Sequence, residues 1–294
     1  MCFMTDGRTD GEIGDQLRPE GQHPSRRSRN RPCIRPHHQP QLEASARHHS
    51  FSAQCKYVSV LTKSFAAMSA THSSSDETVV LYTYFRSGAS WRVRIALNLK
   101  GIAYTPKFVN LLKAEQRTDE YADTVNPSRL LPALIIDGHL LNQSLAILEY
   151  LQETRPNVGP ALLPPATQPE KRALVRSLCH IIASDTQPIQ NLRVLQKVSD
   201  DHAARADWAK HWITLGLQAY EKAIAKCAGK YSVGDEVTMA DVCLVPQIYN
   251  ANRFGVDLAP FPLINRVVAE LNKLEAFDKA KPENQDDNPE KQKQ

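Results

Sequence analysis

Hydrophobic and polar positions divide the chain into a beginning without pattern and a long patterned remainder. Residues 1–67 are rich in Pro, Arg, His and Gln and show no sustained helical or strand period. This composition and the lack of a period predict that the segment is disordered. From about residue 78 the pattern becomes regular. Strand-like and helix-like stretches alternate up to Pro156, a Pro-rich stretch follows, and helical character then continues to about residue 280.

Between residues 78 and 156 the predicted order is strand, helix, strand, a polar loop or short helix, a hairpin and a last helix. The hairpin is indicated by Asp137-Gly138, and the last helix begins at Ser144 and ends before Pro156. This order predicts one small α/β layer with a mixed sheet. The first two strands are expected at 79–84 and 105–111, and the first helix at 90–99.

The predicted fold class is therefore an α/β domain followed by an all-α domain. The C-terminal stretch "KPENQDDNPEKQKQ" is polar and is expected to fray. The expected organisation is a disordered, dispensable extension at 1–77, the α/β domain at 78–156, a Pro-rich linker at 157–168, the helical domain at 169–280 and a polar tail at 281–294.

The N-terminal extension has several possible roles, none of which its sequence supports well. A mitochondrial transit peptide is poor in acidic residues, but acidic residues crowd the start of this extension. The run "RRSRNR" could serve as a nucleic-acid arm, but one short basic run is weak evidence for it. The pairs His37-His38 and His48-His49 lack Cys or carboxylate partners at metal-ligand spacing, so no metal site is expected. Because Met68 opens an ordinary start followed by the first strand, we interpret the extension as dispensable.

Charge and cysteine content restrict the partners of the folded part. The net charge of +4 is the excess of ten Lys/Arg over six Asp/Glu in residues 1–67, so the remainder is neutral and gives no electrostatic reason to bind nucleic acid or membrane. No apolar run approaches the roughly 20 residues that span a bilayer. The six cysteines form no CxxC pair, which favours a reducing, cytoplasmic compartment.

The stretch "YFRSGASWRVRIAL", residues 84–97, passes from a strand through small residues into a helix. The backbone amides and helix dipole there suit a thiolate, and the Ser87 hydroxyl is placed to donate to it. An equally good interpretation is a plain turn with Ser90 as the N-cap. The turn contains no Cys, His or acid, so any nucleophile must come from outside it.

Three further places were weighed for chemistry. Leu131-Pro132 enters the third strand, and by frequency its peptide bond is expected to be trans. Gln143 and Ser144 begin a helix, where either a bound carboxylate or a simple N-cap is expected. Thr238 and Asp241 form a capping-box variant, so Asp241 is interpreted as a folding residue rather than an acid catalyst.

Several separated blocks together give a resemblance to a known family. "YFRSGASWRVRIAL", "LLPAL", "NQSLAILEYL", "QPIQNLRVL" and "VGDEVTMADVCLVPQ" resemble the zeta-class glutathione transferases, the maleylacetoacetate isomerases, over residues Val79 to about Phe277. The resemblance implies a thioredoxin-like, glutathione-binding domain followed by a helical glutathione-transferase domain. It also implies glutathione as cofactor, a small diacid substrate and a cytoplasmic homodimer.

The family's site is carried over residue by residue. Ser87 matches the hydroxyl beside the glutathione sulfur, Leu131 the residue before a cis-proline, and Arg253 an arginine proposed to bind a substrate carboxylate. Ser87 and Arg253 are the implied catalytic residues. The implied glutathione-binding residues are Ser87, Gly88, Ala89, Ser90, Trp91, Arg92, Gln116, Leu131, Gln143, Ser144, Gln187, Asn191, Leu192 and Arg193.

The implied reaction is cis–trans isomerisation of maleylacetoacetate, in which the glutathione thiolate adds to the double bond, the bond rotates and the thiolate leaves. The family motif Ser-Ser-Cys-x-Trp here reads Ser87-Gly88-Ala89-Ser90-Trp91, so a hydroxyl and a thiol are missing. This departure keeps two alternatives open: a transferase acting on small electrophiles such as α-halo acids, and a glutathione-binding scaffold without turnover.

Overall fold

The computed structural model describes residues 78–293, with only the backbone described at Gln292. The chain divides into two units, Met1–Thr71 and His72–Gln294, and every described residue belongs to the second. The expected N-terminal extension, with the roles weighed for it, lies outside the described residues.

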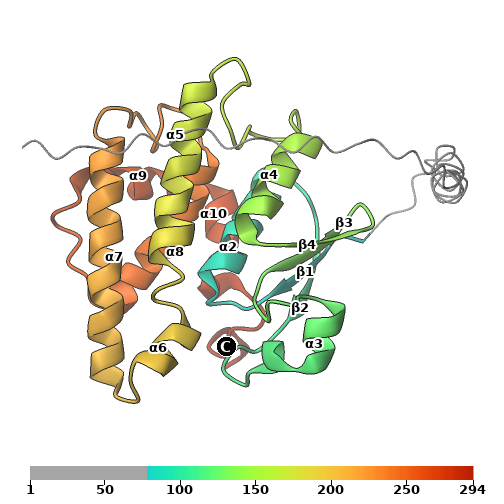
Figure 1. Ribbon diagram of the computed structural model, residues 1–294. Helices are drawn as coiled ribbons and strands as arrows, with labels where there is room; N and C mark the ends of the chain where they lie inside the picture. Colours follow the sequence, from blue (N-terminus) through green and yellow to red (C-terminus); the bar gives the residue numbers. More distant parts are fainter. Residues whose placement is uncertain (1–77, 294) are drawn as a thin grey trace, which may run out of the picture. The chain divides into compact units, whose positions relative to one another are not determined.

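A four-stranded sheet is built from β1 (Val80–Thr83), β2 (Thr105–Phe108), β3 (Ala133–Ile136) and β4 (His139–Asn142), in the spatial order β2-β1-β3-β4 (Figure 1). β1 is parallel to β2 and antiparallel to β3, and β3 and β4 form an antiparallel hairpin. Asp137 and Gly138 turn the hairpin with φ of 52° and 72°, the left-handed conformation that such turns require. The predicted mixed sheet and its hairpin are confirmed.

The sheet separates two hydrophobic cores, because successive side chains on a strand point to opposite faces. Leu81 and Leu134 face the large core, which they share with α2 (Gly88–Leu99) and α4 (Ser144–Thr154). Tyr82 and Ala133 face a smaller cluster with α3 (Asp119–Thr124), which follows the short helix η1 (Glu115–Arg117). This arrangement agrees with the thioredoxin-like domain that the resemblance implied.

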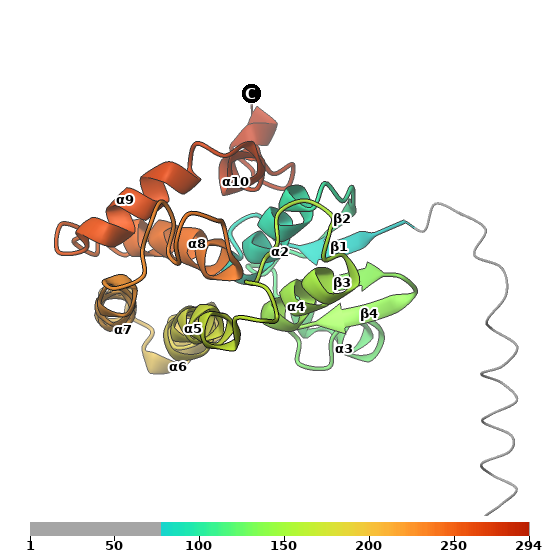
Figure 2. The same cartoon turned by 90° about the horizontal axis from the view of Figure 1, so that it is seen from above.

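The second half of the described chain is helical, as predicted. Its helices are α5 (Pro169–His180), the π-helical turn η2 (Ile181–Thr186), α6 (Leu192–Val198), α7 (His202–Ile224), α8 (Met239–Arg253), α9 (Pro262–Leu271) and α10 (Glu275–Lys279). Figure 2 shows α8 between the other helices: it contacts α2, α5, α7 and α9, and 11 of its 15 residues are buried. α8 therefore joins the helical part to the sheet-containing part through α2.

The N-terminus of α8 is fixed by the capping box predicted from the sequence. Asp241 is fully buried, and its carboxylate accepts hydrogen bonds from the Thr238 amide (2.8 Å), the Thr238 hydroxyl (3.1 Å) and the Ser232 amide (2.9 Å). Burial raises the pKa of Asp241. Because its oxygens are used by backbone and cap donors, Asp241 is a folding residue, as expected.

The C-terminal segment does not fray, so that expectation was wrong. Residues 281–293 form two short helical turns, η3 (Pro282–Asn284) and η4 (Lys291–Lys293), and the side chains of Pro282 and Asn288 are buried. The Asp287 carboxylate accepts a 2.8 Å hydrogen bond from the Phe85 amide, 202 positions earlier in the chain. The polar side chains of the segment form hydrogen bonds with one another and with the backbone, so a polar composition here does not mean disorder.

Within residues 78–293 no helix combines the length and apolar character needed to cross a membrane. The same part of the chain contains no group of His, Cys, Asp or Glu side chains arranged to hold a metal ion.

The capping box gives a testable stability prediction. Replacing Asp241 with Ala leaves two buried backbone amides without acceptors, and each costs about 1–3 kcal/mol, so we expect a loss of roughly 3 kcal/mol in the free energy of unfolding. Asp257→Ala is the matched control, because Asp257 also accepts a backbone amide, that of Ala259, but at an exposed position. Urea unfolding of both variants measures the difference, and equal losses would contradict the role of Asp241.

Candidate functional site

Two adjoining cavities lie where the β1–α2 turn faces the helical part. The larger has a volume of about 690 Å³ and the smaller about 130 Å³, and Ser87, Gln187 and Asn191 are among the residues that line both. Most residues implied by the resemblance line the larger cavity. They are Ser87, Ala89, Arg92, Gln116, Leu131, Gln143, Ser144, Gln187, Asn191, Leu192 and Arg193.

Ser87 is the N-cap of α2 and is held by Ser90. The Ser87 oxygen accepts hydrogen bonds from the Ser90 amide (3.2 Å) and the Ser90 hydroxyl (3.1 Å). A hydroxyl has two acceptor lone pairs and one proton to donate. Because Ser90 occupies the acceptor side, the Ser87 proton is available for a group inside the cavity. The N-cap is therefore Ser87, and the alternative with Ser90 as N-cap was wrong.

Ser90 and Trp91 were expected at the site, but the structure brings neither to a cavity wall. Ser90 is fully buried, and Trp91 is 3% exposed, with its ring edge-on to Tyr249 at 5.5 Å between centroids. They lie in the first turn of α2, where the Trp91 ring packs against Tyr249 of α8. Their geometry fits support of the Ser87 turn rather than contact with a ligand.

The start of α4 forms a second polar wall. Ser144 is buried and its hydroxyl accepts a 3.2 Å hydrogen bond from Nη1 of Arg92, which links the starts of α4 and α2. Gln143 lies at φ 72°, a sparsely populated conformation for a residue other than glycine, and such strain is concentrated at functional sites. The free amides and positive end of the α4 dipole therefore face the cavity.

Leu131 and Gln116 complete this side of the cavity. The Leu131–Pro132 peptide bond is cis, as the resemblance implied and against the expectation from frequency. The loop before it is fixed because the Leu130 carbonyl accepts bonds from the Tyr121 hydroxyl and the Asn126 amide, both at 2.9 Å. Burial raises the pKa of Tyr121, so its hydroxyl stays protonated as a donor.

The opposite wall comes from the helical part, between α5 and α6. Asn191 is the N-cap of α6, and its side-chain oxygen accepts a 3.2 Å bond from the Arg193 amide. His180 and Ser184, which the sequence analysis did not single out, also line the wall, with 2.9 Å between His180 Nδ1 and Ser184 Oγ. The π-helical turn η2 carries Ser184 toward the cavity, a local irregularity that periodicity does not reveal.

The larger cavity is cationic. Its described lining includes Arg92, Arg117, Arg129 and Arg193 and contains no Asp or Glu, while Arg129 is paired with Asp119 outside the lining. Buried polar atoms beside it, Nε and Nη2 of Arg92 and Oε1 of Gln116, have no hydrogen-bond partner among the described residues. The cavity therefore suits an anionic ligand that also carries amide groups.

The smaller cavity holds two cations, Arg86 and Arg253. Among the described residues, no Asp or Glu lines this cavity. The Tyr84 side chain also contributes to its lining. The Arg253 side chain is exposed overall, yet the protein around its guanidinium lowers its pKa, and the like charge of Arg86 adds to this effect. The two guanidinium groups lie over the rings of Phe85 and Phe254, both at 5.1 Å from the ring centroid, and a ligand with more than one carboxylate suits them.

Arg86 was missed by the sequence analysis, and so were Arg117 and Arg129. A signal existed for Arg86, since it directly precedes Ser87 in the strand-to-helix turn. Arg117 ends the short helix η1 and Arg129 lies in the loop between α3 and β3, and no sequence period there shows which side chains turn inward.

The substituted motif positions lie at the two cavities. Ala89 lines the larger and Gly88 the smaller. A β-carbon at Gly88 would lie 3.5 Å from Asn250 Nδ2 and 3.7 Å from Pro246 Cβ, which is ordinary van der Waals contact. The surroundings therefore leave room for a small side chain at position 88, and the glycine is not required by packing.

Comparison with known proteins identifies the family. Residues 86–154 match the family described as "Glutathione S-transferase, N-terminal domain", and residues 198–275 match "Glutathione S-transferase, C-terminal domain". The chain is 52% identical over 219 residues to probable maleylacetoacetate isomerase 2 of Drosophila melanogaster, covering 74% of this chain and 93% of that protein. It is 53% identical over 212 residues to maleylacetoacetate isomerase of Mus musculus, covering 71% and 95%.

Solved structures give the same result. A bacterial maleyl pyruvate isomerase described as a zeta-class glutathione S-transferase is 44% identical, with a TM-score of 0.67 and coverage of 71% of this chain and 99% of that one. Maleylacetoacetate isomerase of Anaeromyxobacter dehalogenans, solved with bound GSH, is 45% identical, with a TM-score of 0.64 and coverage of 72% and 98%. The chain therefore belongs to the zeta-class glutathione transferases.

Proposed function

We propose that this chain is a glutathione-dependent isomerase that converts maleylacetoacetate into fumarylacetoacetate, in the breakdown of tyrosine and phenylalanine. The observation that carries the proposal is the smaller cavity, where Arg86 and Arg253 face a ligand space beside the free Ser87 proton. Relatives at about half identity carry the isomerase name. A cytoplasmic homodimer is part of the proposal, supported by the family resemblance and the absence of CxxC pairs.

The larger cavity fits glutathione, an anionic tripeptide. Its volume lies within the range of about 300–1,000 Å³ typical of small-molecule sites. Its arginine-rich lining matches the two carboxylates of glutathione. The partnerless buried atoms of Arg92 and Gln116 match a ligand that supplies both acceptors and donors.

Within the proposal, the two helix starts divide the binding of glutathione. The N-terminus of α4, with Gln143 and Ser144, holds the γ-glutamyl carboxylate, while Arg92 keeps Ser144 in place. The backbone of Leu131 pairs with the cysteinyl backbone. The Ser87 proton and the N-terminus of α2 stabilise the sulfur as a thiolate. Bound glutathione supplies a nucleophile that adds reversibly to a conjugated double bond.

The protein's other task is to hold the diacid. Arg86 and Arg253 bind its carboxylates and offset the negative charge that develops when the double bond is lost. Leu112, Leu195 and Phe254 provide the apolar part of the lining, which reduces water access. While the thiolate is attached, the former double bond is a single bond and can rotate; expulsion of the thiolate then re-forms the double bond in the trans geometry.

A second candidate function is dehalogenation or conjugation of small α-halo acids. It is favoured by the small volume of the second cavity, about 130 Å³, and by Gly88 and Ala89 in place of the family's serine and cysteine. An α-halo acid carries one carboxylate, so it needs only one of the two arginines.

Removal of Arg253 distinguishes these substrates. A charge-assisted hydrogen bond in a partly enclosed site is worth about 2–3 kcal/mol, so Arg253→Ala is expected to lower kcat/KM for maleylacetoacetate by roughly 30- to 100-fold. An uncharged aryl halide should lose less than about threefold, because it makes no such bond. Arg86→Ala is expected to behave in the same way.

Arg266→Ala is the control for these variants, because Arg266 lies on α9, outside both cavities, and has the same charge and size. Steady-state rates with the two electrophiles measure the effect. Equal losses with the diacid and the aryl halide would remove the basis for a diacid site.

Ser87→Ala tests the activation of the thiol. Loss of one donor from an organised site lowers kcat by about 10²–10³, and here it should also raise the pKa of the bound thiol. Ser184→Ala removes a hydroxyl from the same cavity and should leave that pKa unchanged. Thiolate absorbance against pH measures both variants, and an unchanged pKa in Ser87→Ala would contradict the role of Ser87.

Ala89→Cys tests the departure from the family motif. The native chain is expected to turn over maleylacetoacetate, and the added thiol to change kcat/KM by less than about tenfold, because the Ser87 proton and helix dipole remain. Ala183→Cys places a thiol elsewhere in the same cavity as a control. A native chain that binds glutathione without turnover, and gains activity only in Ala89→Cys, would show that it has left the isomerase reaction.

A further inference from the structure

The C-terminal segment lies against the turn that carries Ser87. The Phe85 amide donates a 2.8 Å hydrogen bond to Oδ2 of Asp287, and Phe85 is followed directly by Arg86 and Ser87. Figure 1 shows the end of the chain returning to the sheet-containing part after α10. A residue near the end of the chain therefore contacts the backbone two positions before Ser87.

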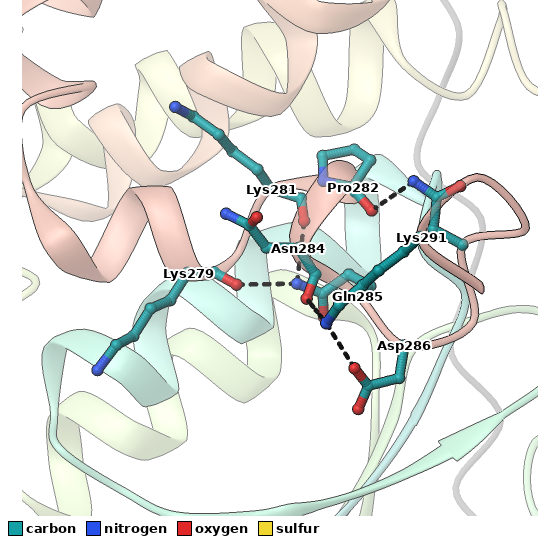
Figure 3. Close-up of polar contacts among 8 residues, drawn as sticks. Lys279, Lys281, Pro282, Asn284, Gln285, Asp286 and Lys291 are labelled. Carbon is teal, nitrogen blue, oxygen red and sulfur yellow. Dashed lines mark hydrogen bonds and ion pairs between the residues drawn. The ribbon is translucent and has the colours of Figure 1, made fainter. Parts of the chain in front are cut away.

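The segment presents Asp287 from a folded support. The Gln285 side-chain amide donates to the carbonyls of Lys279 (2.8 Å) and Lys281 (3.0 Å), and the Asn288 amide donates to the Pro282 carbonyl (3.2 Å) (Figure 3). Figure 3 also shows Lys291 Nζ bonded to the Asn284 carbonyl (3.0 Å) and the Asp286 carboxylate (2.6 Å). The bonds of Gln285 and Asn288 lie on either side of Asp287 in sequence and restrict where its carboxylate points, whereas the Lys291–Asp286 pair is exposed.

Arg94 holds the other side of the same residue. Its guanidinium is fully buried and donates to the carbonyls of Phe85 (3.0 Å), Tyr84 (3.3 Å) and Ala280 (3.1 Å). Phe85 thus has its amide fixed by an acid from the C-terminal segment and its carbonyl fixed by a cation from α2. The Ala280 bond connects that cation to the chain immediately before the segment.

We propose that Asp287 is a positioning residue for the proposed glutathione site: through the Phe85 amide it sets the place of Ser87 in one cavity wall and of Arg86 in the other. It touches neither cavity among the described residues. Its action is therefore indirect, through the backbone between Phe85 and Ser87. The proposal deepens the proposed function and rests on the same site.

The position matters because the Ser87 proton acts over a single hydrogen bond. Misplacement of a catalytic group by about 1 Å can reduce rates by roughly 100-fold. Without the Asp287 acceptor, the Phe85 peptide loses one of its two charged contacts. The backbone between Phe85 and Ser87 then becomes more mobile, so the Ser87 hydroxyl is held less precisely beside the sulfur.

The experiment compares Asp287→Ala, Asp287→Asn and Asp286→Ala in the full chain. Asn retains an oxygen that accepts the Phe85 amide, so it should rescue the loss. Asp286 is the adjacent carboxylate and forms an exposed ion pair with Lys291, so Asp286→Ala controls for loss of one negative charge from the segment.

The first readout is hydrogen exchange of the Phe85 amide in the protein without glutathione. Asp287→Ala should exchange at least about tenfold faster than the native chain, because a local opening needs one hydrogen bond fewer, while the other two variants stay within about threefold. This readout needs no ligand and no turnover. It therefore tests the proposal even if the isomerase function fails.

The second readout is the thiolate absorbance of bound glutathione against pH, together with steady-state kinetics. In Asp287→Ala the pKa of the thiol should rise and kcat should fall by about tenfold, while KM for glutathione stays within about threefold because the α4 wall is unchanged. A purely structural role would lower the active fraction without moving the thiol pKa.

Native Phe85 exchange in Asp287→Ala, or an unchanged thiol pKa in a folded Asp287→Ala, would overturn the proposal. Equal losses in Asp287→Ala and Asp287→Asn would also overturn it, because the amide still accepts the bond. If Asp287→Ala does not fold, Asp287→Leu replaces it as the variant without an acceptor. Asp287→Asn stays the rescue variant, and the same two readouts then test the proposal. Absence of any glutathione thiolate signal in the native chain would instead contradict the proposed function.

Discussion

A buried guanidinium, that of Arg94, is the contact on which the rest of the site depends. It donates to the Thr83 hydroxyl (3.0 Å) and to three backbone carbonyls, which belong to the β1–α2 turn and to Ala280 after α10. Burial lowers its pKa to about 10, opposed by Tyr104 and Asp287, so it remains charged at neutral pH. Burial of a charge is unfavourable unless hydrogen bonds satisfy it, and here four acceptors do so. The same interaction fixes the end of β1, the start of α2 and the path of the C-terminal segment.

The cavities follow from this constraint because their polar groups are mostly ends of elements. Ser87 begins α2, Ser144 begins α4, and Arg92 bonds one to the other. Helix starts leave backbone amides without partners, and here no acid among the described lining residues competes for them. In the proposed site, the groups that hold an anionic ligand therefore have positions set by helix packing, in particular by the contact of α2 with α8.

Local patterns predicted the fold well, since strands, hairpin and helix starts are encoded by nearby residues. Asp137-Gly138 turns the hairpin, and Thr238 with Asp241 begins α8, as expected. The motif match also brought together the walls of the larger cavity, although the role of each residue stays a prediction. Long-range contacts were beyond such reasoning: no period in the sequence links Asp287 to Phe85, so the segment was expected to fray. Ser90 and Trp91 fell outside the cavities because motif membership does not distinguish a ligand contact from the side chains that support it.

The loss of the family's serine and cysteine affects the two cavities differently. In the proposed function, stabilisation of the thiolate relies on the Ser87 proton and the α2 backbone, neither of which depends on the side chains at 88 and 89. In the proposed function, discrimination among substrates depends on the smaller cavity, where burial and the like charge of Arg86 lower the pKa of Arg253. A dicarboxylate offers each of the two guanidinium groups a counter-charge, whereas a monocarboxylate offers a counter-charge to only one, so this pair of cations favours a diacid. Retention of Arg86 and Arg253 therefore supports the proposed isomerase reaction, and Gly88 and Ala89 leave the groups proposed to stabilise the thiolate in place.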